Sequence, residues 1–523
     1  MPPIKRRSMD PAARASAPSL SLPAAALHGH DTATLSQAMG LLAIVGDLSM
    51  GQPIDGSERA ARLAARVAAA AGANAAACEH ARMVALLRWS GCTANAAGFA
   101  AMLGDDVGAR HALVSSTLDA RQAARLSDTT GLAEVHCEVA GDIAAMMGLP
   151  AAVESGLRHV WEHYDGSGIP LRLRGDEVPN VVYYAALGGD LEILARVHGV
   201  ERALDMIAQL GDVKYPARLV ALVSPHARAW LDELESTEAP SPQPDFLPVS
   251  APLTLVADMI ELKLPWLAGY SRRVALLAQE AAQLAGLPEA QQRLVARAAL
   301  LHGIGRAAVT NTVWERSGRL SAADWEAVRL APYWTARAGS RIDGLGPDAQ
   351  LASHVYERLD GSGYFRSLDA SALGAPQRLL GVAAAWTALR SPRPWRAAHE
   401  PAAAIALLEA QVTGGRFDRA TVDAVLAAAA DVRTTPAHGT GTAGAGAAGG
   451  ANGSAGAPVR ATLSAREAEV LQRISLGESN KEAARAMRIS PGSVRTHVES
   501  IFRKLDCSTR AAATLKALTL GLI

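Results

Sequence analysis

The sequence has few cysteines, few aromatic residues, no long apolar run and no net charge. Its four cysteines are scattered and form no CxxC pair, which argues against a disulfide framework or a zinc site and favours a reducing interior. No apolar run reaches the roughly 18 residues that cross a bilayer, and no apolar segment follows Lys5, Arg6 and Arg7 as it would in a signal peptide. With 51 basic and 51 acidic residues, the whole chain has no net attraction to nucleic acid or membrane. We therefore expect a cytoplasmic protein that does not bind membranes.

Hydrophobic residues make up 49% of the chain, many of them alanine, and they recur with the 3.6-residue period of helices. At 523 residues the chain is too long for a single core. Three segments interrupt the helical pattern: residues 1–26 are rich in Pro, Ala and Ser, residues 236–249 hold four prolines, and residues 433–458 are mainly Gly, Ala and Ser. We predict a disordered N-terminus and two linkers there. The remaining parts are block one at 27–235, block two at 250–432 and a C-terminal domain at 459–523.

The two blocks repeat each other. EHYDGSGIP at 162–170 corresponds to ERLDGSGYF at 357–365, 195 residues later. Arg88 corresponds to His302 at an offset of 214, which places about nineteen extra residues in block one, between Cys92 and His136. Both blocks are dominated by helical periodicity. We predict an all-α fold in which two tandem helical bundles precede a tethered C-terminal domain.

The C-terminal domain contains three helix starts. Ser464 with Glu467 and Ser479 with Glu482 have the spacing of capping boxes, and Ser490 precedes a proline at the first helical position. Only three residues separate the second helix from the third. This is the tight turn of a helix-turn-helix, which we place at 479–498.

The third of these helices has two faces. Its apolar residues recur at helical spacing and are expected to pack on the first two helices: Val494, Val498, Ile501, Phe502 and Leu505. Hydrogen-bonding and cationic residues point away from them: Ser493, Thr496, His497, Ser500 and Lys504, flanked by Arg495 and Arg503. From residue 462 onward there are 10 basic and 6 acidic residues, so basicity is concentrated here. These features favour the major groove of DNA over the alternative, a helical bundle with a solvated basic face.

These residues resemble the LuxR-type four-helix DNA-binding domain, through LSAREAEVL, SNKEAA, ISPGSVRTHVESIFRKL and STRAAA. One departure is Gly492, where the family often has a longer residue. The resemblance implies phosphate contact from Lys481, base and backbone contacts around Ser493 to His497, and dimerisation through the last helix. We therefore predict double-stranded DNA as partner, a homodimer, and a DNA-binding set of Lys481, Ser493, Val494, Arg495, Thr496, His497, Arg503 and Lys504.

Block two resembles the HD-GYP domain, a helical phosphohydrolase family that cleaves cyclic di-GMP. The matching words are ALLHGIGR, VRLAPYWTAR, VYERLDGSGYF and RSPRPWR. Block one matches more weakly, through PIDGSERAARLA, HCEVAGDIAAMMGLP and WEHYDGSGIPLRLRGDEVP. The resemblance implies a cluster of His and Asp around two or three metal ions, which polarise phosphate and generate hydroxide.

Most of the implied ligand positions hold other residues. In block two these are Tyr270, Gly303, Ala331, Val355, Tyr356 and Ala384, and in block one Gly56, Arg88, Trp89, Val160 and Trp161. His302, His136 and Asp190 survive. A catalytic metal site needs at least three ligands and an open position, so we predict no metal, no cofactor and no catalysis. We expect bulky residues, Trp89, Trp161, Tyr270 and Tyr356, to fill the vacated volume. His136 and Asp190 either hydrogen-bond each other or hold one metal ion, and Asp165 and Asp360 cap the two DGSG turns.

Three functions follow as hypotheses. The first is a sequence-specific transcription regulator whose catalytically inactive bundles serve in sensing or dimerisation. The alternative is a metal-dependent cyclic di-GMP phosphodiesterase with an attached helix-turn-helix. The third is a receptor for a nucleotide, in which Arg88 or Arg306 meets phosphate, although an arginine at the protein surface usually has no such role.

Overall fold

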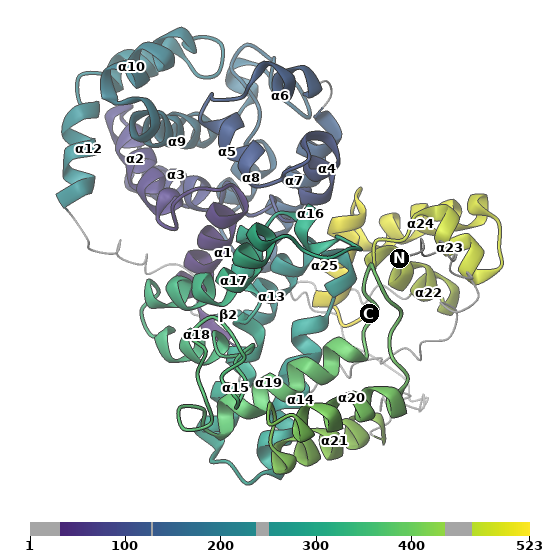
Figure 1. Cartoon of the computed structure of the whole chain (residues 1–523). Helices are drawn as coiled ribbons and strands as arrows, with labels where there is room; N and C mark the ends of the chain where they lie inside the picture. The colour runs from purple at the N-terminus through teal and green to yellow at the C-terminus, as the bar shows by residue number, and fades with distance from the viewer. Residues whose placement is uncertain (1–31, 127–128, 237–249, 435–462) are drawn as a thin grey trace, which may run out of the picture.

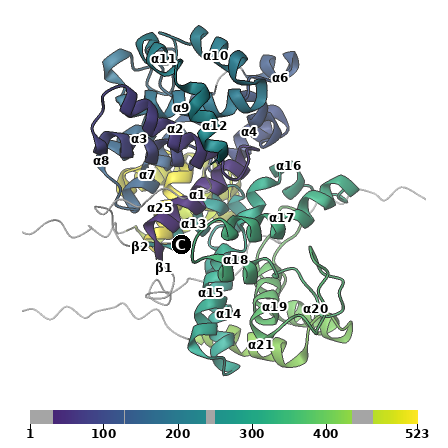
Figure 2. The same cartoon turned by 90° about the vertical axis from the view of Figure 1, so that its left-hand side faces the viewer.

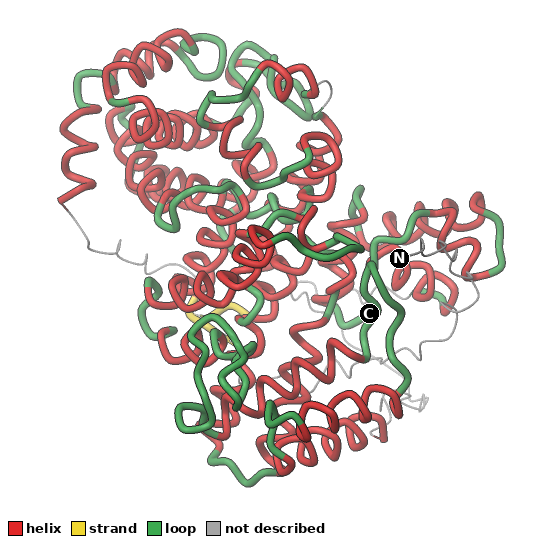
Figure 3. Tube along the Cα trace, in the orientation of Figure 1, coloured by secondary structure: helices red, strands yellow, loops and turns green. Residues whose placement is uncertain are grey.

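The computed structural model describes residues 32–126, 129–236, 250–434 and 463–523, and it is all-α as predicted (Figures 1 and 3). The strands in these ranges are β1 (Thr32–Thr34) and β2 (Ser250–Pro252), which pair with each other. The disorder predicted for 1–26 and most of both predicted linkers lie outside the described residues. The start predicted for the second linker, residue 433, falls inside a helix that ends at Thr434.

Block one is built from twelve described α-helices and the 3-10 helix η2 (Gly175–Glu177). The α-helices are α1 (Leu35–Ser49), α2 (Gly56–Ala70), α3 (Ala75–Leu87), α4 (Ala96–Leu103), α5 (Gly108–Val114), α6 (Ala120–Arg125), α7 (Thr130–Met146), α8 (Ala151–Arg158), α9 (Asn180–His198), α10 (Val200–Gln209), α11 (Ala217–Val223) and α12 (Ala227–Ser236). Helices α2, α3 and α9 pack together at its centre. The segment between Cys92 and His136, where about nineteen extra residues are predicted, contains α4, α5 and α6.

Block two has the same kind of centre, in which α14, α15 and α19 pack together. Its elements are α13 (Leu253–Leu262), η3 (Pro265–Leu267), α14 (Tyr270–Leu284), α15 (Glu289–Leu301), η4 (Ile304–Ala308), α16 (Asn311–Trp314), α17 (Ala322–Ser340), α18 (Gly346–Ala352), α19 (Ala375–Leu389), α20 (Pro401–Thr413) and α21 (Arg419–Thr434).

The two blocks have equivalent hydrogen bonds as well as equivalent central helices. In block one the Glu162 carboxylate accepts hydrogen bonds from the backbone N–H groups of Leu171 and Leu173. In block two Glu357 accepts them from Arg366 and Leu368, each 195 residues later. The same construction therefore holds the loop after each DGSG turn.

The DGSG turns are capped as predicted. The N–H of Ser167 donates to Asp165 at 2.7 Å, and the N–H of Ser362 donates to Asp360 at 3.0 Å. The glycine inside each turn has a positive φ, +80° at Gly166 and +75° at Gly361, a conformation that side chains disfavour. These glycines are therefore accounted for by the fold.

The two blocks pack closely against each other (Figure 2). Their first strands pair antiparallel, with Ala33 opposite Ala251, and helix α1 contacts α13 and η4. Asp106, which lies between α4 and α5, reaches block two, where it pairs with Lys263 and accepts a 2.7 Å hydrogen bond from the N–H of Asn311. The side chains of Asp106 and Lys263 are both fully buried. The residues inserted in block one thus take part in the contact between the blocks.

The C-terminal domain has the predicted helices: α22 (Ala465–Ser475), α23 (Asn480–Met487), α24 (Pro491–Leu505) and α25 (Arg510–Thr519). Both capping boxes form, and the Ser490 side chain accepts from the N–H of Ser493. These features are set by residues three apart along the chain, which is why the sequence predicts them well.

The C-terminal domain packs on the two blocks, which the prediction of a loosely tethered domain did not anticipate. Helix α25 contacts α7 of block one and α13 of block two (Figures 1 and 2). Ala513 and Ala517 belong to the domain's own core, whereas Ala512 and Leu515 are buried in the core shared with the blocks. Helix α25 is therefore apolar on two sides, and its second side is covered by the rest of the chain.

Candidate functional sites

The N-terminal half of α24 presents polar side chains to solvent. Ser493, Arg495 and Thr496 are exposed and His497 is half-buried. The Arg495 side chain is 77% exposed, and its only described ion pair is with Glu499, at 2.9 Å on the same helix. Lys481, at the start of α23, is exposed as well. This surface offers a guanidinium, an imidazole and two hydroxyls, groups that suit base edges and phosphates.

Two members of the predicted DNA-binding set lie elsewhere. Val494 is 0% exposed in the core of the C-terminal domain, so its side chain cannot reach a base edge. The Lys504 ammonium donates to Glu467 of α22 at 2.7 Å, and the Ser500 hydroxyl donates to the same carboxylate at 2.8 Å. The hydrogen bond from Lys504 lowers the pKa of Glu467 to about 2. Lys504 and Ser500 thus tie α24 to the start of α22, and both Lys504 and Arg503 are exposed.

In block two, Arg306 links three residues at the implied metal positions: His302, Tyr356 and Tyr270. His302 donates from Nδ1 to the Ala299 carbonyl at 2.5 Å, and its Nε2 accepts from Arg306 at 3.1 Å. Arg306 also donates to the Tyr356 hydroxyl at 2.9 Å and lies over the Tyr270 ring, 5.3 Å from its centroid. Burial, followed by the charge of Arg306, lowers the pKa of His302 to about 3, so the ring is neutral and both of its nitrogens are engaged.

The surface location assumed for the two arginines is wrong. Arg306 and Arg88 are buried, with exposures of 6% and 4%. Nη1 of Arg306, and Nε and Nη2 of Arg88, have no hydrogen-bond partner among the described residues. Periodicity places a residue on a face of its helix, but it does not show whether another element covers that face, so this burial could not be predicted from the sequence.

In block one, His136 and Asp190 do not bond to each other. His136 donates from Nε2 to the Arg88 carbonyl at 2.9 Å, and its Nδ1 lies 3.6 Å from the Cys92 sulfur. Asp190 pairs with Lys214 at 2.7 Å. Burial lowers the pKa of His136 to about 3. The rings of Trp89 and Trp161 lie against each other, 5.5 Å between centroids, and Trp161 also contacts the His136 ring. The Trp161 indole thus packs on the buried His136 ring, and the Trp89 indole packs on Trp161.

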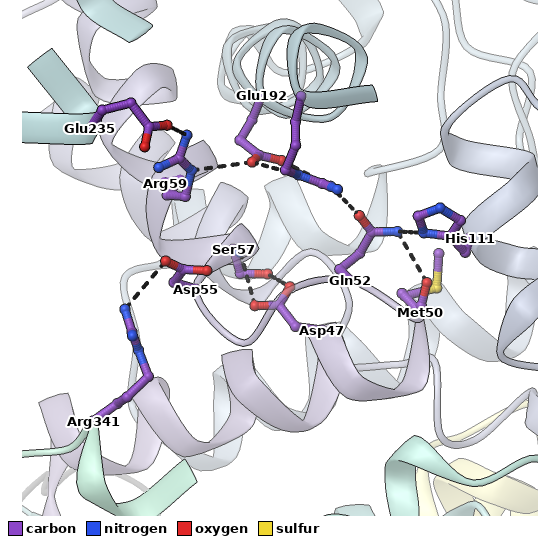
Figure 4. A network of polar contacts seen from close by, with 11 residues as sticks. Asp47, Met50, Gln52, Asp55, Ser57, Arg59, His111, Glu192, Glu235 and Arg341 are labelled. Atoms are coloured by element: carbon purple, nitrogen blue, oxygen red, sulfur yellow. Dashed lines mark hydrogen bonds and ion pairs between the residues drawn. The ribbon is translucent and has the colours of Figure 1, made fainter. Parts of the chain in front are cut away.

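A buried carboxylate lies beside each of these clusters, and the sequence analysis did not identify either of them. Asp47 of α1 accepts from the N–H and hydroxyl of Ser57, within the polar network of Figure 4. Glu261, 214 residues later, accepts from the N–H groups of Tyr270 and Ser271. The offset of 214 already relates the blocks here, so the repeat was the available signal. Burial raises the pKa of both Asp47 and Glu261 to about 7.

These raised pKa values predict a pH dependence of stability. Since each carboxyl holds its proton in the folded chain up to about pH 7 but loses it near pH 4 when unfolded, its contribution to stability falls as pH rises between these values. Wild type should therefore lose stability relative to the Asp47→Asn/Glu261→Gln double variant, by more than about 1 kcal/mol, between pH 4.5 and 8. Urea unfolding at several pH values measures this difference.

The control for this experiment is Glu134→Gln, at an exposed position of α7, which should run parallel to wild type. The three buried histidines, His136, His302 and His354, have lowered pKa values and contribute in the opposite sense, but they are common to all the proteins compared. A difference between wild type and double variant that stays constant with pH would contradict the prediction.

Within the described residues, no three His, Cys, Asp or Glu side chains come together as a ligand set for a metal ion. No described helix combines the length and apolar character of a membrane-spanning segment.

Comparison with protein families gives two matches. Residues 254–421 match the HD domain model, and residues 461–517 match the model for bacterial regulatory proteins of the luxR family. The second match covers the four C-terminal helices almost completely. Both agree with the resemblances drawn from the sequence.

Curated relatives fall into the same two groups. The chain is 28% identical to 3'3'-cGAMP-specific phosphodiesterase 3 of Vibrio cholerae, over 53% of this chain and 63% of that protein. It is 32% identical to the cyclic di-GMP phosphodiesterase response regulator RpfG of Xanthomonas campestris, over 33% of this chain and 46% of that protein. The probable transcriptional regulatory protein NarL of Mycobacterium tuberculosis is 47% identical over 12% of this chain and 29% of its own length. The chain thus spans less than two thirds of each relative.

A solved structure shares the fold. The cyclic GMP-AMP specific phosphodiesterase V-cGAP3 of Vibrio cholerae superimposes with a TM-score of 0.54 and 22% identity, covering 77% of this chain and 99% of its own. The covered share exceeds block two and the C-terminal domain together, so the likeness extends into block one.

Proposed function

Because the chain joins an HD domain to a C-terminal LuxR-type helix-turn-helix domain, we propose that it is a sequence-specific DNA-binding transcription regulator whose HD-type blocks serve in sensing or dimerisation. The observation that carries the proposal is the exposed N-terminal half of α24, with Ser493, Arg495, Thr496 and His497 on a fully capped helix-turn-helix. Lys481 and Arg503 supply exposed cations beside it. A homodimer would present two such helices to a two-fold symmetric site.

The blocks are proposed to be catalytically inactive. Their centres do not fit a cluster of metal ions, because the lone pair of His302 accepts from Arg306 and a guanidinium occupies the place where cations would bind. His136 is enclosed by Trp161 and bonded to a backbone carbonyl, and Asp190 is neutralised by Lys214. A buried arginine beside such a site repels a divalent ion.

A cyclic dinucleotide is the ligand class we propose for sensing. Arg306 and Arg88 each keep buried N–H groups without a described partner, and guanidinium N–H groups bind phosphate oxygens well. Relatives of the HD-type blocks are named for cyclic dinucleotides, cGAMP in one and cyclic di-GMP in another.

The proposal is tested by selecting duplexes that bind the purified full chain and measuring their affinity by fluorescence anisotropy. Affinity should fall steeply with salt, by about 0.9 in log K per log unit of salt for each phosphate neutralised. Scrambled duplex of equal length is the control. If no duplex is enriched and selected and scrambled DNA bind alike, sequence-specific recognition is refuted.

The alternative is a metal-dependent phosphodiesterase carrying a helix-turn-helix, which the names of its relatives favour. We expect the full chain, purified without chelator, to hold less than one Fe or Mn per chain and to leave cGAMP and cyclic di-GMP intact. Elemental analysis and chromatography of the nucleotides measure both quantities, with V-cGAP3 assayed in parallel. Two or more metal ions per chain together with hydrolysis would establish the enzyme instead.

A further inference from the structure

Helix α25 lies between the two blocks and contacts both. On α7 of block one, Asp142 pairs with Lys516 at 3.3 Å, Met146 accepts from the Thr519 hydroxyl at 3.6 Å, and Glu138 accepts from the N–H of Ser508. These α7 residues follow each other at intervals of four, so they lie along one face of the helix. We use the name α25 seat for the surface that contacts the C-terminal domain. It consists of this face of α7 (Glu138, Asp142 and Met146) and of helix α13, Pro265 and Gly269 of block two.

Block two supplies the other side of the seat. Helix α13 packs on α25, and Leu518 lies so close to Gly269 that a Cβ there would be 3.5 Å from its Cδ2. Pro265 meets the turn at Gly477, where a Cβ would be 3.3 Å from the proline ring. Because the two sides belong to different blocks, the shape of the seat depends on how the blocks are placed relative to each other.

The α25 seat matches α25 in charge as well as in shape. Asp142 is only 3% exposed, and it pairs with Lys516 of α25 and with Arg158 of its own block at 2.9 Å. Loss of Lys516 from this position would leave a buried carboxylate with a single cation. Such partly buried charge pairs contribute more to specificity than exposed ones.

The seated domain has its proposed DNA-binding surface free. Arg495, Ser493, Thr496 and Lys481 are exposed with α25 in place. Figure 1 shows α23 and α24 on the side of the domain away from the blocks. Seating therefore orients the surface without covering it.

We propose that the α25 seat couples the two HD-type blocks to DNA binding, by holding the helix-turn-helix in one outward orientation that a shift between the blocks disturbs. This inference rests on the proposed function for its DNA readout. A fixed orientation lowers the ordering cost of binding, as preorganisation does in general. Because the blocks cover α25, the dimerisation through this helix that the LuxR resemblance implies does not form while the domain is seated.

The test uses the full chain with Met146→Glu, which puts a carboxylate beside Thr519 and Asp142 without changing the C-terminal domain. Glu138→Arg, which sets a cation against the N–H of Ser508, is an independent second variant. Glu134→Arg, at an exposed position one turn earlier on α7, is the matched control. Two quantities are measured: hydrogen exchange of the amides of residues 510–519, and affinity for the selected duplex.

We expect wild type and the control to protect these amides, and both seat variants to exchange them at least tenfold faster while binding the duplex at least fivefold more weakly. Faster exchange with unchanged affinity would refute coupling, and faster exchange with tighter binding would show that the seat inhibits. Unprotected amides in wild type would refute the seat itself. A wild type that binds no duplex would refute the proposed function, and with it the coupling; faster exchange in the seat variants than in wild type would then still establish the seat.

Discussion

The Arg495→Ala/His497→Ala double variant is expected to bind the selected duplex about 100-fold more weakly than wild type. Each side chain that reads a base edge contributes about 1–3 kcal/mol of discrimination, and these two are the largest donors on the exposed half of α24. Among the described residues, Arg495 forms an ion pair only with Glu499 of the same helix, and His497 forms no hydrogen bond or ion pair with another element. Removing them should therefore leave the fold intact. Anisotropy titrations at fixed salt measure the loss.

The matched control is Arg466→Ala, which removes an exposed arginine of α22 that pairs with Glu469 at 2.6 Å. It loses one cation from the same domain and should change affinity less than threefold. Lys504→Ala is the informative comparison, since Lys504 bonds to Glu467 at 2.7 Å and should act mainly on stability. Equal losses of affinity in the double variant and in Arg466→Ala would mean that Arg495 and His497 contribute to DNA binding only through their positive charge.

Lys263→Ala is expected to lower the free energy of unfolding by about 3–5 kcal/mol. The Lys263–Asp106 pair is fully buried between the two blocks, and removing one partner leaves the other charge without compensation. Asp106 keeps hydrogen bonds from the Thr310 hydroxyl and the Asn311 N–H, which limit the cost but do not supply a cation. Urea unfolding followed by far-UV circular dichroism measures the change.

Arg293→Ala serves as the control for this prediction. Arg293 pairs with Glu289 one turn away on α15, and both side chains are exposed, so its loss should cost less than about 1 kcal/mol. A single transition with the same midpoint as the control would contradict the importance of this pair.

The helix-turn-helix could be predicted almost completely from the sequence. Capping boxes at Ser464 and Ser479 depend on residues three apart, and the apolar stripe of α24 follows a fixed period, so both are local properties. The same stripe already placed Val494 inside the domain, and the family resemblance alone assigned it to the DNA contact. The buried position of Val494 agrees with the prediction from periodicity.

The sequence by itself determined the helical blocks, their repeat, the capped helix-turn-helix and the substitutions at the implied metal positions, because these follow from local spacing and residue identity. Only the tertiary structure decided that Arg306 bonds His302 inside the block, that Lys504 turns to Glu467, and that α25 is seated between α7 and α13. Each of these depends on which surfaces meet. Hydrophobic periodicity relates only residues of the same helix, so it does not show which helices pack together. Whether a polar side chain faces water or a partner is set by the element that covers it.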